Sequence, residues 1–170
     1  TEDFSSYKGQ ALTARALIYF DLVRLYGKAY TDDPTAYGVP NVTTTLEASA
    51  QPLRATVEEN YAQILSDLAA GAPLLSKDPT DGYLNYYANK ALQARVNLYM
   101  GDHAAALSAA EEIINDGVYA LYDNNAWVDS WKTQFGSESI FELGILPNEG
   151  DLGSGSLGFY LRRYRHGAET

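Results

Sequence analysis

Cysteine is absent from this 170-residue chain, which excludes disulfide bonds, thiolate nucleophiles and cysteine-based metal sites. Histidine is almost as rare, because the only two, His103 and His166, lie far apart in the sequence. A histidine-rich metal cluster therefore lacks ligands, and we expect no metal and no cofactor. Phosphate-cradling glycine loops and serine nucleophile motifs are missing too, so the sequence favours a protein that is not an enzyme.

Basic residues are also few: the chain has 12 lysines and arginines but 22 acidic residues, so its formal net charge is −10. A surface this acidic repels phosphate backbones, which disfavours nucleic acid as a partner. No apolar run has the length of a membrane span, and no signal peptide is recognisable. The chain begins with Thr1, so we interpret residues 1–170 as a single domain that is a piece of a longer or processed protein.

Hydrophobic residues make up 46% of the chain, and their spacing predicts four helices, over about residues 8–26, 56–70, 84–100 and 103–116. A proline-containing segment, residues 28–53, is predicted to be a long irregular loop. Trp127, Trp131 and Phe135 suggest a further short helix. Residues 139–145 resemble a strand within a loosely held β or irregular tail, residues 139–170. We therefore expect an all-α fold with a small β or irregular C-terminal part.

The pattern Ala-Leu-x-Ala-Arg-x-x-x-Tyr occurs at residues 11–19 and again at residues 91–99. Helix hairpins that repeat and stack are typical of tetratricopeptide-like antiparallel arrays, which form a right-handed superhelix. Each copy places an arginine, Arg15 or Arg95, among apolar neighbours. A buried guanidinium needs a carboxylate or carbonyl partner, so we predict that both are structural buried arginines in ion pairs. The alternative is a ligand-facing arginine at the mouth of a groove.

The first copy of this pattern lies in a longer run, residues 14–27, that resembles the signature helix of the SusD/RagB family. Further segments resemble later motifs of that family in the same order, and they are residues 38–40, 54–61, 90–102, 111–119 and 139–142. The resemblance extends over roughly residues 8–146.

Several expectations follow from this resemblance. Members of the family are non-enzymatic proteins, lipid-anchored on the extracellular face of the outer membrane, with tetratricopeptide-like helices. They bind oligosaccharides or polysaccharides for nutrient uptake and cover a SusC-like TonB-dependent transporter. The chain lacks the family's lipobox cysteine and its C-terminal half, and the sugar-stacking aromatic residues best known in the family lie outside the matched stretch. The resemblance therefore implies the scaffold and assigns no ligand-binding residue.

Aromatic residues are the remaining candidates for a binding site, because flat rings stack on sugars. Trp127 and Trp131 lie four residues apart, so both rings could share one helix face. Tyr83 belongs to a tyrosine cluster with its neighbours at 86 and 87, and Tyr37 lies on the long loop. The alternative for the tryptophans and the tyrosine cluster is packing, in which the rings only dock helices against each other.

Two further hypotheses remain open. Residues 78–82 and 123–125 carry oxygen ligands that calcium could use, but neither has EF-hand spacing, and ordinary turns are favoured. The repeat by itself also fits a tetratricopeptide-like scaffold that holds another protein and has no sugar site of its own.

Overall fold

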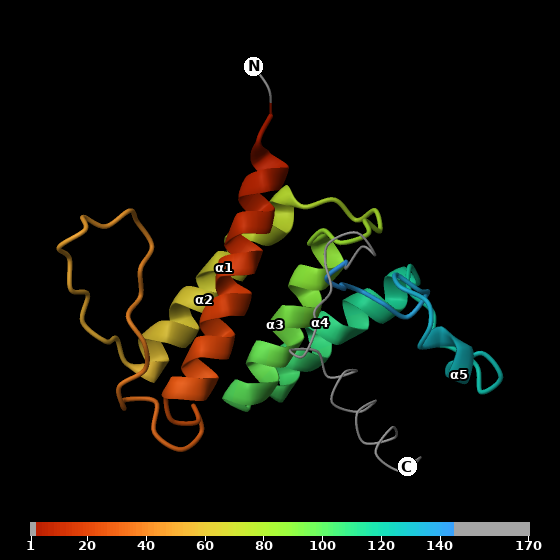
Figure 1. Ribbon diagram of the computed structural model, residues 1–170. Coiled ribbons are helices and arrows are strands. Elements are labelled where there is room, and N and C mark those ends of the chain that lie inside the picture. The colour runs from red at the N-terminus through yellow and green to blue at the C-terminus, as the bar shows by residue number, and fades with distance from the viewer. Residues whose placement is uncertain (1–2, 145–170) are drawn as a thin grey trace, which may run out of the picture.

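The computed structural model describes residues 3–144, and every regular element in that range is a helix (Figure 1). The elements are α1 (Ser5–Tyr26), α2 (Val57–Gly71), the short 3₁₀ helix η1 (Ala72–Leu74), α3 (Tyr86–Met100), α4 (His103–Asp116) and α5 (Trp127–Ser130). The all-α class is therefore confirmed. The four predicted helices are all present, and the largest difference at an end is that α1 begins three residues before the predicted start at residue 8.

The helices form two antiparallel hairpins, α1 with α2 and α3 with α4, and these are the two most extensive helix pairs in the fold (Figure 1). The hairpins meet where α3 packs against α2 and η1. Helices α1 and α3, which carry the repeated sequence pattern, are each the first helix of a hairpin. The pattern therefore marks a structural repeat, as a tetratricopeptide-like arrangement requires.

Short-range sequence signals define the helix ends. Thr56 and Glu59 form a capping box at the start of α2, in which each side chain accepts a hydrogen bond from the other residue's backbone N–H. The carboxylate of Asp102 accepts a hydrogen bond from the N–H of Ala105 and so caps α4. Gly101 has φ of 80°, a left-handed conformation that glycine adopts without strain, which allows α3 to turn into α4 within two residues.

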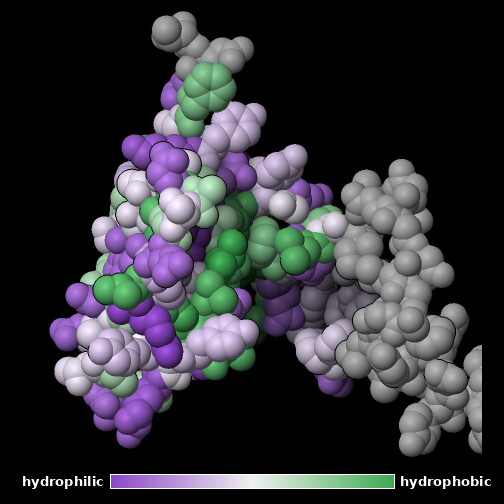
Figure 2. All heavy atoms as spheres, turned by 60° about the vertical axis from the view of Figure 1, so that its left-hand side comes forward, coloured by the Kyte–Doolittle hydropathy of each residue, from purple (hydrophilic) through white to green (hydrophobic). Residues whose placement is uncertain are grey.

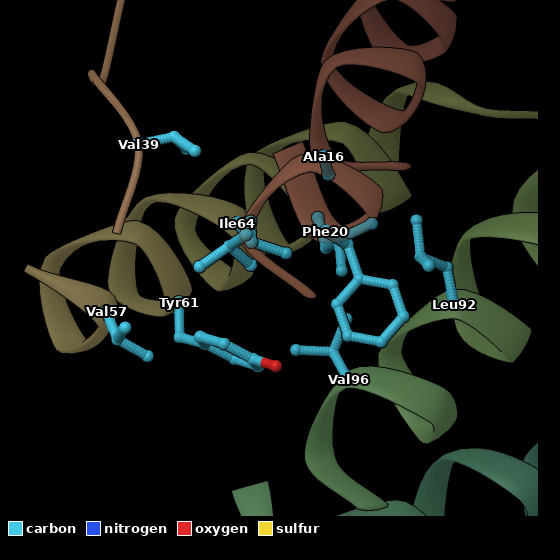
Figure 3. Close-up of a cluster of buried hydrophobic side chains, with 10 residues drawn as sticks. Ala16, Phe20, Val39, Val57, Tyr61, Ile64, Leu92 and Val96 are labelled. Carbon is cyan, nitrogen blue, oxygen red and sulfur yellow. The ribbon is translucent and has the colours of Figure 1, made fainter. Parts of the chain in front are cut away.

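The core lies between α1, α2 and α3 (Figure 3). Phe20 of α1 is at its centre and makes an edge-to-face contact with Tyr61 of α2, with ring centroids 6.1 Å apart. The other fully or nearly buried members of this cluster are Ala16, Val23, Val39, Val57, Ile64, Leu68, Leu92 and Val96. Because α4 contributes no residue to the cluster, the second hairpin is held to the first through α3.

Part of the long loop is fixed by a buried asparagine. Asn60 of α2 accepts a hydrogen bond from the N–H of Val39 and donates one to its carbonyl, both at 2.8 Å. Arg54 donates to the backbone carbonyls of Gly38 and Tyr26 and so ties the loop to the end of α1. Tyr37 and Thr56 form an isolated β-bridge. The loop therefore follows α2 closely here, while residues 43–53 are exposed and extend away from the helices (Figure 1).

The strand predicted over residues 139–145 is wrong for the part that the structure describes, residues 139–144, because those residues form no strand. A strand needs a partner for its backbone groups, and the local backbone turns back on itself instead. The N–H of Ser139 donates to the carbonyl of Gly136, and the carbonyl of Ser137 accepts from Ala120. The rest of the expected tail, residues 145–170, lies outside the described residues.

Candidate functional site

Arg15 has the carboxylate partner that the sequence predicts. Its Nε and Nη2 atoms donate to the two carboxylate oxygens of Asp67 on α2 at 2.7 and 2.6 Å, a bidentate pair. The side chain of Asp67 is 4% exposed and that of Arg15 is 30% exposed. This hydrogen bonding raises the pKa of Arg15 above its ordinary value. The pair links the two helices of the first hairpin, which is a structural role.

Arg95 differs from the prediction, because it is exposed rather than buried. The structure gives it no carboxylate partner among residues 3–144, and its guanidinium lies 5.8 Å from the centroid of the Phe20 ring. Asp67 of α2 provides a carboxylate for Arg15 of α1, whereas α4 provides no carboxylate for Arg95 of α3. Arg95 instead lines a groove of about 480 Å³ between α1, α3 and residues 138–142.

Trp127 and Trp131 lie together, as their spacing predicts. Trp127 begins the one-turn helix α5 and Trp131 follows its last residue, so the rings meet edge to face, with centroids 5.7 Å apart and planes at 84°. The residues are 50% and 77% exposed. No residue of α5 is fully buried, and only Ser130 among its four residues is half-buried.

Both tryptophans line a cavity of about 510 Å³. Its other residues are Tyr122, Ser130, Lys132, Thr133, Gln134, Glu138, Ser139 and Glu142. The cavity therefore combines flat apolar rings with hydroxyl and carboxylate groups, which is the composition that carbohydrate recognition needs. Lys132 forms an ion pair of 2.8 Å with Asp129, and both side chains are mostly exposed.

The two glutamates are held in place by backbone groups. Glu142 accepts a hydrogen bond from the N–H of Phe135 at 3.1 Å, and Glu138 accepts one from the N–H of Tyr122 at 3.5 Å. Hydrogen bonds from Ser139, and then from the Phe135 backbone, hold the pKa of Glu142 below its ordinary value. Glu142 is therefore an anion at neutral pH.

Close packing positions Tyr122, which lines this cavity. A Cβ atom at Gly136 would overlap the hydroxyl oxygen of Tyr122, so only glycine allows the ring to lie against the backbone there. Phe135 has φ of 54°, which is uncommon for a residue with a large side chain. Sequence reasoning missed Tyr122, Glu138 and Glu142, because they lie in irregular structure where no periodicity indicates which way a side chain points.

The other aromatic candidates do not join this cavity. Tyr83 is 62% exposed and Tyr37 is 71% exposed, and each stands on a loop away from the tryptophans. The neighbours of Tyr83 behave differently, because Tyr87 is buried and contacts Tyr86 and Tyr119 edge to face. Tyr86 and Tyr87 of the predicted tyrosine cluster therefore pack α3 against α4 and the chain that follows it, while Tyr83 stays exposed.

The possible calcium segments form turns. Asp78 accepts a hydrogen bond from the hydroxyl of Ser76, and Asp123 accepts from the N–H groups of Asn125 and Ala126. Within residues 3–144 no group of three or more histidine or acidic side chains could hold a metal ion. Among the same residues, no helix has the length and apolarity that crossing a membrane requires.

The paired helix hairpins define a class of protein, a tetratricopeptide-like helical-repeat scaffold. The family model described as "Starch-binding associating with outer membrane" matches residues 1–99. The chain belongs to this SusD-like family.

Solved structures agree with that assignment. A SusD superfamily protein from Bacteroides thetaiotaomicron is 37% identical, with a TM-score of 0.83 over 88% of this chain and 34% of that one. A laminarin-binding SusD-like protein is 28% identical, with a TM-score of 0.66 over 82% of this chain and 31% of that one. A SusD-like protein of Formosa agariphila is 26% identical over 152 residues, which is 88% of this chain and 27% of the relative. The chain thus spans about a third of the length of the relatives that it matches.

Proposed function

We propose that this protein captures an oligosaccharide or polysaccharide at the extracellular face of the outer membrane and passes it to a TonB-dependent transporter. The observation that carries the proposal is the exposed pair of Trp127 and Trp131 over a cavity lined by hydroxyl and carboxylate groups. Membership of a family described as starch-binding, and the likeness to a laminarin-binding protein, support the same ligand class.

The ring geometry suggests how a sugar would bind. Because the two indole planes stand at 84°, they form a corner and cannot both stack on one flat ribbon of sugar units. One pyranose ring can stack on one indole while the second indole flanks its edge. Ser130 and Glu138 line the same cavity and can hydrogen-bond the hydroxyl groups.

The same residues argue against hydrolysis. A glycoside hydrolase needs a carboxylic acid that is protonated near neutral pH to serve as the general acid. The pKa of Glu142 is lowered rather than raised, which is the wrong direction for that role. A binding protein without catalytic activity is therefore the function that we propose.

The surface location, lipid anchor and transporter partner are part of this proposal and rest on the family. Its description places its members with the outer membrane. A SusC-like transporter barrel is the partner that the family resemblance implies. Co-purification of the chain with such a barrel after co-expression tests this part separately from sugar binding.

Sugar binding is tested by isothermal titration of the chain with starch, laminarin and other plant or host oligosaccharides. Trp127→Ala and Trp131→Ala should each weaken binding by about tenfold or more, equivalent to about 1.4 kcal/mol, because a central aromatic contact is lost. Tyr26→Ala is the matched control, since Tyr26 is 66% exposed and lies at the end of α1, outside the cavity. Unchanged affinity in both tryptophan variants would remove the site from consideration.

A second candidate function is a scaffold that binds only protein. The observation favouring it is that the helices expose large apolar side chains, including Ile18, Leu25, Leu98, Leu107 and Ile114. Figure 2 shows a band of hydrophobic surface on one face of the molecule, flanked by hydrophilic side chains. A folded chain that binds no sugar in the panel but co-purifies with a transporter barrel would favour this scaffold.

A further inference from the structure

The charges around the tryptophan cavity restrict which sugars it can accept. Its lining includes two carboxylates, Glu138 and Glu142, and one ammonium group, on Lys132. Lys132 is itself paired with Asp129 at 2.8 Å, so its charge is largely offset. The two glutamates form no ion pair with any lysine or arginine among the described residues. The cavity therefore carries a net negative charge.

Backbone hydrogen bonds help to position these two carboxylates. Each one accepts a hydrogen bond from a backbone N–H, Glu138 from Tyr122 and Glu142 from Phe135. Both glutamates are half-buried, which reduces the solvent screening of their charges compared with freely exposed side chains. Arg95 lines the neighbouring groove, which Glu138 and Glu142 also border, but it does not line the tryptophan cavity and forms no ion pair with either glutamate.

We propose that the tryptophan cavity selects uncharged glycans and rejects uronate-containing or sulfated ones. An uncharged pyranose offers an apolar face to the indoles and hydroxyl donors to Glu138 and Glu142. A uronate would bring a third carboxylate beside those of Glu138 and Glu142, and like charges close together repel. The net charge of −10 on the whole chain adds to this repulsion at longer range. This inference rests on the proposed sugar-binding function.

The test is calorimetric titration of the full chain with two hexasaccharides, an uncharged laminarin fragment and oligogalacturonate. At an ionic strength of about 10 mM, where charges act over about 30 Å, the uncharged sugar should bind at least about tenfold more tightly. The difference in affinity between the two sugars should narrow at about 0.15 M salt, where the distance over which charges act falls to about 8 Å. Tighter or equal binding of oligogalacturonate at low salt would overturn the inference.

Variants assign the selectivity to the two glutamates. The double variant Glu138→Gln with Glu142→Gln keeps oxygen acceptors in place and removes both charges, so it should bind oligogalacturonate about tenfold more tightly than the parent does at low salt. Glu111→Gln is the matched control, because Glu111 is exposed on α4 and outside the cavity. Circular dichroism verifies that both variants are folded. An equal gain in Glu111→Gln would overturn the assignment to the cavity.

Failure of this inference can be distinguished from failure of the proposed function. Tight binding of oligogalacturonate that is lost in Trp127→Ala overturns the charge selectivity and leaves the sugar site intact. Binding of neither hexasaccharide, nor of any sugar in the wider panel, overturns both proposals. Preference for the laminarin fragment, lost in Trp127→Ala and relaxed in the double glutamine variant, supports both.

Discussion

Removal of Arg15 should destabilise the fold far more than removal of Arg95, although both occupy the same position in the repeated sequence. Arg15→Ala leaves the carboxylate of Asp67 in a site where its side chain is 4% exposed. Gln63 still donates to Asp67 at 2.9 Å, but a neutral amide does not balance the charge. Breaking a fully buried pair costs about 3 to 5 kcal/mol.

Because the Arg15 side chain is 30% exposed, water can enter the vacated space and reduce that cost. We therefore expect Arg15→Ala to lower the free energy of unfolding by about 2 to 3 kcal/mol. The corresponding fall in Tm is roughly 5 to 10 °C for a chain of this length. Arg95→Ala removes the contact of an exposed guanidinium with the buried Phe20 ring and should cost about 0.5 kcal/mol.

Urea unfolding followed by circular dichroism measures these differences, and a double-mutant cycle isolates the pair. Arg15→Ala combined with Asp67→Ala removes the stranded charge, so the double variant should be more stable than the sum of the single losses predicts. Equal losses for Arg15→Ala and Arg95→Ala would refute the reasoning. Additive losses in the cycle would show that the two side chains do not interact.

Two further predictions concern polar contacts elsewhere in the fold. Asn60→Leu leaves the N–H and carbonyl of Val39 without their hydrogen-bond partners. The free energy of unfolding, measured in urea, should therefore fall by about 2 to 4 kcal/mol. A loss below about 1 kcal/mol would mean that the loop finds other hydrogen-bond partners. A hydrogen bond from Lys77 lowers the pKa of Asp116 below its ordinary value of 3.8. The pair therefore stabilises the fold fully above pH 3.8. This stabilisation is lost as the pH falls through the lower pKa that Asp116 has in the folded state. Lys77→Ala should therefore lower the free energy of unfolding only slightly near pH 7, because both side chains are partly exposed. The loss should be smaller in stronger acid, where the ion pair is gone and only the contact of Lys77 with the Tyr86 ring remains. An equal loss at both pH values would contradict the ion-pair account.

The helices could be predicted from the sequence because their signals are local. Apolar spacing and end residues such as Thr56, Asp102 and Gly101 act within a few positions of each other, and the structure uses each of them. The repeat could be predicted for the same reason. The lack of a carboxylate partner for Arg95 among residues 3–144 could not be predicted, because the residue opposite an arginine comes from another helix, and the two hairpins differ there.

The cavity was predictable only in part. The spacing of Trp127 and Trp131 brings their rings together, and this contact is present. Glu138 and Glu142 lie four residues apart, a spacing that would indicate a helix face, yet residues 136–144 contain no helix. Their placement depends on backbone hydrogen bonds to Tyr122 and Phe135. No pattern in the sequence encodes contacts between irregular segments of this kind.

The way Asn60 and Arg54 anchor the connection between α1 and α2 has a practical consequence. Residues 43–53 form an exposed loop (Figure 1). The hydrogen bonds of Asn60 and Arg54 hold residues before this loop, Val39 and Gly38, and do not involve its exposed part. Surface loops of this type accept inserted sequence at little thermodynamic cost. An affinity tag or reporter group inserted there could attach the chain to a sensor surface while leaving the indole rings free to report on sugar.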